Sequence, residues 1–361
     1  MNHLLSNSLA IIRAGQSPGG AYVASPTFPQ YRYCWLRDGT WIAYAMDRLG
    51  AHDSARAFYR WVGRTLLRHE ARLGRLLAKL ADGQEPDEED YLPTRFRPDG
   101  EVGQEFWWDF QLDGYGSWLW GLCAHLALTG DEALWEALRP AVRLTVRYLE
   151  ALWQSPNYDC WEEFRDRVHI STLAALYGGL SAVERQEAAL VPGGLPEQIR
   201  RFVLRHGVAA SGHFCKFVGN EAVDASLLWV AVPYGVVDVH DERFGRTLAK
   251  IERDLRHPQG GVYRYAADTY YGGGEWLLLT AWLGWVYVEL GRVEAARQIL
   301  GWVEAQATPE GQLPEQVSGH LLAPAHYAQW EQRWGPVACP LLWSHAMYLI
   351  LAAALGEETR G

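Results

Sequence analysis

Two adjacent acids, Glu162 and Glu163, lie between Trp161 and Phe164 in the sequence WEEF. Apolar neighbours and a second carboxylate both raise the pKa of a carboxyl group. A raised pKa is what a general acid needs in order to work near neutral pH. Adjacent carboxylates at a helix start are also favoured by the helix dipole, so a purely structural interpretation of this segment is equally open.

A third candidate acid, Glu315, lies in the sequence LPEQV at residues 313–317. Pro followed by Glu can begin a helix, but residues 318–338 have the composition of a loop and contain no clear helix to cap. Glu315 is therefore a better candidate for accepting a proton than for capping. It is far from Glu162 in the sequence, so only the fold can bring the two carboxyl groups together.

Aromatic residues beside Arg, Asp or Gln recur just before predicted buried helices. The first cluster contains Tyr31, Trp35, Arg37 and Asp38, and the second spans residues 106–116. Such a mixture suits a sugar, because hydroxyl groups need paired donors and acceptors while the apolar face of the ring stacks on indole. The alternative is a capped helix with core aromatics, in which Asp38 is the N-cap.

Two further features have mainly structural interpretations. Glycines recur in residues 260–276, and glycines before a helix can bind phosphate, but no strand precedes them and no GKS or GKT follows. A turn, or a close approach of backbone to a ligand, is favoured there. His345 lies in an apolar helical segment and is more often a core residue than a catalyst.

Helical periodicity dominates the rest of the chain, and strict alternation is rare, so no sheet is expected. The pattern predicts twelve helices, at residues 2–14, 37–50, 53–80, 111–129, 131–153, 167–181, 182–206 with a break near 192–196, 223–235, 241–255, 273–291, 293–307 and 340–355. Residues 223–235 and 273–291 are apolar nearly all round, whereas 241–255 and 293–307 are amphipathic. This alternation predicts six hairpins closed into a double-layered toroid. An irregular helical bundle is the alternative, and a solenoid is disfavoured because we find no repeat.

Composition excludes several classes of protein. The chain has 361 residues, 49% of them hydrophobic, and a net charge of −10, which indicates a globular protein without a basic surface for nucleic acid. The longest uncharged stretch, 335–356, is predicted to be a buried helix and not a membrane span. The N-terminus shows no signal-peptide pattern.

The cysteines form no CxxC pair, so neither a zinc site nor a disulfide framework is expected, and a reduced, cytoplasmic protein is the default. They are Cys34, Cys123, Cys160, Cys215 and Cys339.

Tryptophan is unusually common, at 18 residues. Position along the chain divides these residues into two groups. Trp118, Trp229 and Trp285 lie inside predicted buried helices and are expected in the core. The second group lies at helix starts beside acids and arginines: Trp35, Trp107, Trp161 and Trp276.

Six motifs in order resemble glycoside hydrolase family 15, the glucoamylase-like family. They are YRYCWLRD at 31–38, WxxxQLDGYG at 107–116, WEE at 161–163, DASLLWV at 224–230, YRY at 263–265 and PEQ at 314–316. The resemblance runs from about Ser25 to Ala346. It implies an all-α (α/α)6 barrel, here a single domain over residues 1–361, and an inverting hydrolase that needs no metal or cofactor. The longer bacterial members carry an N-terminal β-sandwich domain, and we expect a short form without it.

The resemblance also implies roles for individual residues. Glu162 corresponds to the general acid and Glu315 to the general base. Arg37 and Asp38 correspond to the pair that grips the terminal glucose, while Asp113 supports the site. The other implied sugar-binding residues are Tyr31, Trp35, Trp107, Gln111, Trp161, Glu163, Arg264 and Trp276.

The expected activity is exo-acting hydrolysis of short α-gluco-oligosaccharides from the non-reducing end, with release of β-glucose and a preference for isomaltose. Alternatives within the family are α-1,4-specific glucoamylase-type or maltose-type hydrolysis and trehalase activity. A six-hairpin phosphorylase is disfavoured by Glu315, and an inactive sugar-binding protein by the presence of both carboxylates.

Residues 320–335 could cover the cleft or form a surface excursion. If they cover it, they could supply aromatic side chains to a second sugar, namely Tyr327, Trp330 or Trp334. The partner is therefore a small oligosaccharide, with no nucleic acid or membrane expected and no prediction of oligomeric state.

Overall fold

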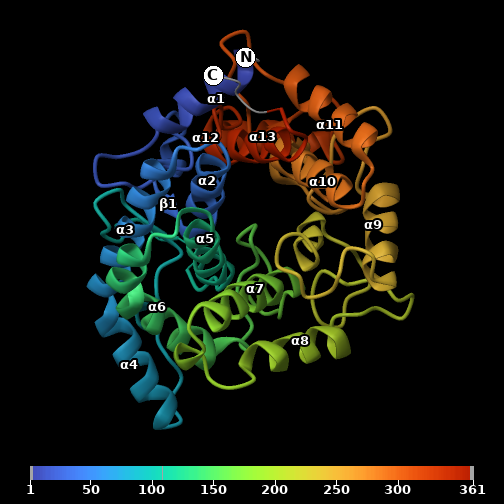
Figure 1. Ribbon diagram of the computed structural model, residues 1–361. Coiled ribbons are helices and arrows are strands. Elements are labelled where there is room, and N and C mark those ends of the chain that lie inside the picture. The colour runs from blue at the N-terminus through green and yellow to red at the C-terminus, as the bar shows by residue number, and fades with distance from the viewer. Residues whose placement is uncertain (1–2, 108, 358–361) are drawn as a thin grey trace.

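The computed structural model describes residues 3–107 and 109–357. Helices dominate this part of the chain (Figure 1), and they are α1 His3–Ala14, α2 Leu36–Arg48, α3 His52–Arg68, α4 Glu70–Ala81, α5 Asp113–Thr129, α6 Glu132–Leu152, α7 Ile170–Gln186, α8 Leu195–His206, α9 Glu242–Asp254, α10 Leu277–Glu289, α11 Val293–Ala305, α12 Tyr327–Trp334 and α13 Leu342–Ala354. Short 3-10 helices lie between them, namely η1 Pro29–Tyr31, η2 Glu88–Asp90, η3 Ala188–Leu190, η4 Ala225–Val230, η5 Tyr270–Gly272 and η6 Pro324–His326. Asn2 of the first predicted helix and Trp108 of the second aromatic cluster lie outside the described residues.

An inner ring of elements closes on itself. Each of α2, α5, α7, η4, α10 and α13 contacts the next, and α13 contacts α2 again. The outer elements α1, α3, α6, α8, α9 and α11 pack against this ring, as Figure 1 shows. The predicted toroid of six hairpins is therefore confirmed, and the irregular bundle is wrong.

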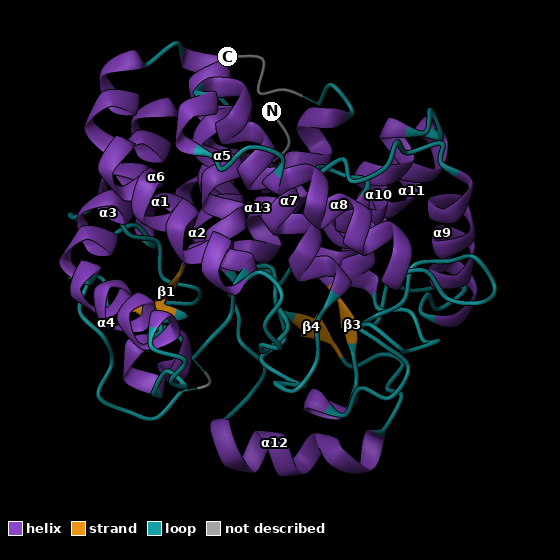
Figure 2. Ribbon diagram, turned by 90° about the horizontal axis from the view of Figure 1, so that it is seen from below, coloured by secondary structure: helices purple, strands orange, loops and turns teal. Residues whose placement is uncertain are grey.

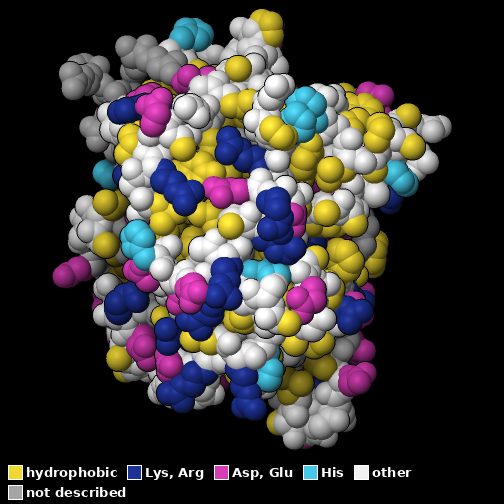
Figure 3. Space-filling model, turned by 90° about the vertical axis from the view of Figure 1, so that its right-hand side faces the viewer, with side chains coloured by type: hydrophobic (Ala, Val, Ile, Leu, Met, Phe, Trp, Pro, Cys, Tyr) yellow, Lys and Arg dark blue, Asp and Glu magenta, His cyan; other side chains and the backbone are white. Residues whose placement is uncertain are grey.

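The burial of individual helices follows their position in the two layers. Every residue of α10 from Leu277 to Tyr287 is buried, because this helix has neighbours on both sides. The outer helix α9 buries one stripe at helical spacing, made of Phe244, Thr247, Leu248 and Ile251. On the side of the molecule that carries α9, acidic and basic side chains are interspersed and no large region of one charge is seen (Figure 3).

Tryptophan fills the centre of the inner ring. Trp41 and Trp282 have ring centroids 4.4 Å apart, and Trp229 lies 5.2 Å from Trp282. The predicted core residues Trp118, Trp229 and Trp285 are all buried. Large indole rings occupy the space that six inner elements enclose, which accounts for part of the high tryptophan content. No helix of the described residues is long and apolar enough to cross a membrane.

The helix predicted over residues 223–235 is wrong. The chain forms only the 3-10 helix η4 there, with the Asp224 carboxylate accepting a hydrogen bond from Ser226 N at 2.8 Å. Pro233 supplies the physical reason, since it lacks an N–H and disfavours helical backbone at Val232. The segment is nevertheless buried, as its apolar composition predicts, and it completes the inner ring.

Three further expectations need correction. The helix predicted over 53–80 divides at His69, whose ring Nε2 lies 2.9 Å from the carbonyl oxygen of Gly100. The segment 318–338, expected to be a loop, contains α12, which Figure 2 shows on the side of the barrel that carries β3 and β4. Two antiparallel ladders of two residues each also form, where no strand was expected. They pair β1 Cys34–Trp35 with β2 Arg95–Phe96, and β3 Glu275–Trp276 with β4 Gln316–Val317.

The inner helices α5 and α7 approach each other through glycine. A Cβ atom added at Gly179 would lie 2.2 Å from the carbonyl oxygen of Gly116, and one added at Gly116 would lie 2.4 Å from that of Ala175. Both contacts are with backbone, which cannot rotate away as a flexible side chain can. These glycines therefore set the separation of two helices of the ring.

We expect Gly179→Ala to lower the free energy of unfolding by about 1–3 kcal/mol, because the new methyl group overpacks the α5–α7 contact. Chemical denaturation followed by circular dichroism measures the change. Gly301→Ala is the matched control, because nothing lies within 4 Å of a Cβ at this exposed helical position. There the same substitution should stabilise the protein by about 0.5–1 kcal/mol. A Gly179→Ala protein as stable as the wild type would contradict this account of the packing.

Candidate active site

A pocket of about 310 Å³ lies where the inner helices α2 and α10 begin. Glu162 and Glu315 both line it. The predicted sugar-binding residues that line it are Tyr31, Trp35, Arg37, Asp38, Trp107, Trp161, Glu163, Arg264 and Trp276. The fold thus collects almost the whole predicted site into one cavity, and Gln111 is the predicted residue that does not line it.

The Glu162 carboxyl group is held by two indole rings. Its Oε1 accepts hydrogen bonds from Trp35 Nε1 at 2.7 Å and from Trp107 Nε1 at 3.0 Å. Burial raises the pKa of Glu162, although the positive charge of Arg37 and the hydrogen bonds from Trp107, Trp35 and Gln111 oppose the rise. The raised pKa expected from the sequence is therefore present.

The surroundings of Glu162 differ from those expected from the sequence. The indole nitrogen of Trp161 donates to Asp224 at 3.1 Å, and Phe164 is 41% exposed. The donors to the Glu162 carboxyl group are Trp35 and Trp107 instead. The acids also lie in a turn that ends well before α7 begins at Ile170, so they are not at the start of the helix that follows them. Sequence neighbours are not spatial neighbours in a turn, which explains the difference.

The turn that carries Glu162 has unusual backbone geometry. Glu162 and Phe164 have φ angles of 67° and 53°, in the left-handed region. Such a conformation costs roughly 1–2 kcal/mol for each residue that has a Cβ atom. The Asp159 carboxylate compensates, because its Oδ1 accepts hydrogen bonds from Trp161 N at 3.0 Å and Glu163 N at 2.9 Å. Strain of this kind persists only where the surroundings determine the conformation, and it clusters at functional sites.

Glu315 lies in a different environment, next to a phenol. Tyr31 donates a hydrogen bond from its hydroxyl group to Glu315 Oε1 at 3.0 Å. The other oxygen, Oε2, is buried and accepts no hydrogen bond within the part of the chain that the structure describes. Burial raises the pKa of Glu315 to about 8, although the Tyr31 hydrogen bond and the charge of Arg264 lower it. The Oε2 atom is therefore a strong proton acceptor when the group is ionised.

The two carboxyl groups are close to one another but not in contact. Tyr31 contacts Glu315, Trp35 contacts Glu162, and the two aromatic rings meet edge to face with centroids 5.8 Å apart. Burial is the largest cause of the raised pKa of Tyr31, and the negative charges of Glu315 and Glu162 raise it further. A pair of aromatic rings thus separates two acids that face one cavity.

Arg37 and Asp38 lie in the first turn of α2, side by side. Arg37 Nε lies 3.3 Å from Asp38 Oδ2, and both side chains are less than 10% exposed. The N-cap interpretation of Asp38 is wrong, because the N-cap position belongs to Trp35. Burial raises the pKa of Asp38 to about 6, although Arg37 lowers it. The pair therefore offers a buried donor and acceptor to the pocket.

Gln111 and Asp113 support this pair from behind. Arg37 Nη1 donates to Gln111 Oε1 and lies near Asp113 Oδ2, both at 3.1 Å. Gln111 also hydrogen-bonds Glu162 and lowers its pKa. Gln111 is therefore placed to orient Arg37 and Glu162, and not to touch a ligand in the pocket. Asp113 is fully buried, as expected of a supporting residue.

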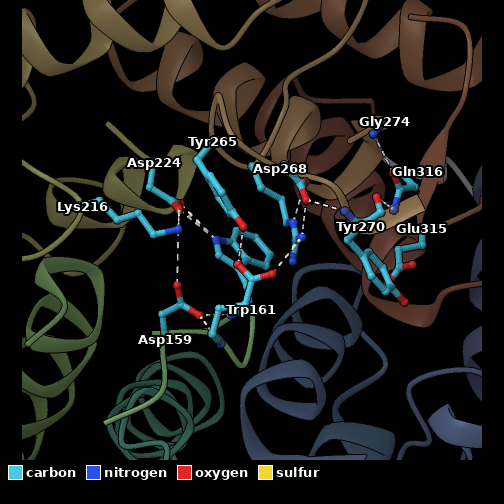
Figure 4. Close-up of polar contacts among 12 residues, drawn as sticks. Asp159, Trp161, Lys216, Asp224, Tyr265, Asp268, Tyr270, Gly274, Glu315 and Gln316 are labelled. Atoms are coloured by element: carbon cyan, nitrogen blue, oxygen red, sulfur yellow. Dashed lines mark hydrogen bonds and ion pairs between the residues drawn. The ribbon is translucent and has the colours of Figure 1, made fainter. Parts of the chain in front are cut away.

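A second buried arginine connects to the acid turn. Arg264 Nε donates to Asp268 Oδ2 at 2.7 Å, and its Nη2 lies 3.4 Å from Glu163 Oε1. Tyr265 donates a short hydrogen bond to Glu163 Oε2. Burial raises the pKa of Glu163 despite the opposing charge of Arg264. Figure 4 shows Asp268 and Tyr265 beside this group of contacts.

The helix α12 covers the pocket. Trp330 and Trp334 line the cavity, and Trp334 stacks on Trp107 with ring centroids 6.3 Å apart. Trp330 packs edge to face on Tyr270 at 4.9 Å. Segment 320–335 therefore does contribute aromatic rings to the site, whereas Tyr327 packs against Tyr271 and does not line the cavity.

The sequence analysis did not assign five residues of the pocket lining to the site, namely Ala24, Cys160, Tyr270, Leu341 and Trp343. Tyr270 shares a hydrogen bond with the Tyr31 hydroxyl at 2.8 Å, so it belongs to the network around Glu315. Trp343 and Cys160 also line the cavity. The sequence signal for Tyr270 was its place in an aromatic and glycine-rich segment, while Trp343 resembled an ordinary core residue of a buried helix.

Two features prove to be structural. His345 is fully buried, accepts a hydrogen bond from Leu313 N at 3.0 Å through Nε2 and contacts Ser8 through Nδ1 at 2.9 Å. Burial lowers its pKa to about 3, so it is neutral. In the glycine-rich segment, Gly261 N donates to Glu275 Oε1 at 2.7 Å, which makes a packed turn and not a phosphate site.

Clusters of residues that could hold a metal ion lie outside the pocket lining. One cluster is Asp47 with His52 and His125, and the other is Glu275 with His257 and His320. Within each cluster, the atoms that could bind a metal lie within 4.8 Å of one another. None of these residues lines the pocket. The chemistry of the pocket itself is that of carboxylates, guanidinium groups and aromatic rings, and the expectation that no metal takes part stays a prediction.

Comparisons with known proteins find glycosidases. A curated relative, an isomaltose glucohydrolase from Kribbella flavida, is 45% identical over 99% of this chain and 93% of its own length. A solved glycosidase structure, also 45% identical, superimposes with a TM-score of 0.93 over 98% of this chain and 96% of that one. A bacterial glucoamylase solved with acarbose shares the (α/α)6 barrel fold, at 20% identity, a TM-score of 0.77, and 99% and 56% coverage.

The sequence profile of glycosyl hydrolases family 15 matches residues 1–353. The family resemblance inferred from the six motifs is therefore confirmed over nearly the whole chain. The chain belongs to glycosyl hydrolases family 15 and is a glycoside hydrolase.

Proposed function

We propose that this enzyme hydrolyses the α-1,6 bond of isomaltose and of similarly short α-gluco-oligosaccharides, with release of β-glucose from the non-reducing end by one catalytic domain. The observation that carries this proposal is the pair Glu162 and Glu315. Both line one small pocket, both have a raised pKa, and each is held by a different aromatic donor. Two carboxyl groups flanking a scissile bond are the machinery of most glycoside hydrolases.

In the proposed mechanism, Glu162 is the general acid. Its carboxylic acid gives a proton to the glycosidic oxygen while the bond from C1 to that oxygen breaks. Water attacks C1 from the opposite face and gives a proton to Glu315, most directly to Oε2, the oxygen that Tyr31 does not occupy. Glu162 then takes up a proton and Glu315 loses one to solvent. Separation of the two carboxyl groups by about 6.5–9.5 Å leaves room for this water in inverting enzymes.

The remaining polar groups of the pocket suit a glucose ring. Arg37 with Asp38, and Arg264 with Glu163, present charged donors and acceptors in pairs, which matches neighbouring sugar hydroxyl groups. Because these groups are already buried and fixed, they need little reorganisation as the transition state forms. Trp276 forms an apolar wall beside them.

Pocket size and similarity both support a short substrate. A volume of about 310 Å³ is at the small end of the range for ligand sites, which runs to about 1,000 Å³. The α12 tryptophans, Trp330 and Trp334, line this pocket and would limit the space beyond a first sugar. The α-1,6 linkage is supported by the isomaltose glucohydrolase relative at 45% identity. Trehalases are more distant, at 24–27% identity over about half of their length.

Initial rates of glucose release from isomaltose, maltose and trehalose at equal concentration test the substrate. We expect isomaltose to be hydrolysed fastest, without any requirement for phosphate. A faster rate on maltose or trehalose would reassign the linkage. Activity that depends on phosphate and forms a sugar phosphate would indicate a phosphorylase instead.

Replacement of either acid should abolish turnover without loss of fold. We expect Glu162→Gln and Glu315→Gln each to lower kcat on isomaltose by roughly 10²–10⁴-fold, the usual contribution of a general acid or base. Near-UV circular dichroism checks the fold, and Glu150→Gln, on the exposed face of α6, is the control. An active Glu315→Gln enzyme would mean that another group accepts the proton.

The pH profile should report the indole donors of Glu162. The Trp107 hydrogen bond lowers the pKa of Glu162, so Trp107→Phe should raise this pKa. The limb of the kcat/KM profile that reports the titration of Glu162 should therefore move to higher pH. Trp153→Phe, between α6 and α8, is the control. A Trp107→Phe profile in which neither limb moves would refute the assignment of Glu162 as the acid.

A further inference from the structure

Lys216 forms a buried ion cluster beneath the acid turn. Its ammonium nitrogen lies 2.8 Å from Asp224 Oδ2 and 3.4 Å from Asp159 Oδ2. The three side chains are at most 6% exposed. Figure 4 shows Lys216 between the two carboxylates, with Trp161 beside them. One cation thus balances two carboxylates that have no access to bulk water.

Both carboxylates hold the residue that precedes Glu162. Asp159 Oδ1 accepts hydrogen bonds from the backbone N–H groups of Trp161 and Glu163. Both oxygens of Asp224 lie 3.1 Å from the indole nitrogen of Trp161. The backbone and the side chain of Trp161 are therefore anchored to two acceptors, and Lys216 pairs with both of them.

Lys216 also reaches the residue that follows Glu162. Its nitrogen lies 3.4 Å from the centroid of the Tyr265 ring, a cation–π contact. The hydroxyl group of Tyr265 donates to Glu163. Both sequence neighbours of Glu162 are therefore tied to Lys216 through a single intermediate group.

Loss of the ammonium group would change the state of these acceptors. Burial raises the pKa of Asp159, and Lys216 is the largest influence that lowers it. Without Lys216, Asp159 would take up a proton in order to avoid an uncompensated buried charge. A neutral carboxyl group is a weaker acceptor for the two backbone N–H groups that hold the left-handed turn.

We propose that Lys216 is a positioning residue for general-acid catalysis: it fixes the turn so that Glu162 reaches the glycosidic oxygen, without touching the substrate. Lys216 does not line the pocket. The proposal rests on the assignment of Glu162 as the acid. Under this proposal, the position of the Glu162 carboxyl group depends on the positive charge of Lys216 beneath the turn.

A comparison of two substrates tests this role. Hydrolysis of isomaltose needs a proton on the leaving oxygen. In α-D-glucosyl fluoride the leaving group is fluoride, which departs without being protonated. We expect Lys216→Met to lower kcat on isomaltose by about 100-fold, the effect of a displacement of about 1 Å, with KM changed by less than about threefold. On the fluoride the loss should be below about tenfold. Lys216→Arg should recover much of the isomaltose activity, because it keeps the charge.

Lys250→Met is the matched control, because Lys250 pairs with Asp254 on the outer helix α9 and should leave both rates unchanged. An equal loss on both substrates, or no loss, in Lys216→Met would overturn the proposal. Should Lys216→Met not fold, Asp159→Asn gives the second measurement and should show the same substrate dependence.

The wild type and Glu162→Gln separate this proposal from the proposed function. Glu162→Gln should also lose far more activity on isomaltose than on the fluoride. If it does so and Lys216→Met does not, only the role of Lys216 fails. If the wild type hydrolyses neither substrate, the proposed function fails as well.

Discussion

Removal of carboxyl groups from water, in a cavity walled by aromatic rings, is the constraint on which this site depends. Burial is the largest influence on Glu162, Glu163, Glu315 and Asp38, and in each case it raises the pKa. Indole, phenol and guanidinium groups then adjust each carboxyl group separately. The difference in partners makes two chemically similar side chains suited to opposite roles, one to give a proton and one to accept it.

The ring of helices makes that burial possible. Six inner elements bring residues from distant parts of the chain to one end of the barrel, and tryptophans such as Trp41 and Trp282 fill its centre. The turn that carries Glu162 lies outside any helix and holds two residues in the left-handed region. Its conformation is therefore determined by Asp159, Asp224 and their counterion, and not by helical propensity.

The fold and most of the pocket follow from the sequence, because apolar periodicity reports burial and the six motifs contain most of the residues that line the pocket. The sequence could not reveal contacts between distant residues. It suggested Trp161 as the apolar neighbour of Glu162, but Trp35 and Trp107 hold that group, because the turn points its side chains in different directions. Gln111 looked like a ligand contact yet supports Arg37. The segment 223–235 was too apolar to distinguish a helix from the 3-10 turn that Pro233 imposes.

The anomeric form of the first glucose released tests the central claim most directly. If Glu162 gives a proton to the leaving oxygen while Glu315 takes one from water on the opposite face, each turnover inverts the configuration at C1. Proton NMR during the first minutes of isomaltose hydrolysis should then show the β-anomer accumulating first, followed by slow mutarotation. Initial accumulation of α-glucose would show retention and would contradict the assignment of Glu162 and Glu315 as an inverting pair.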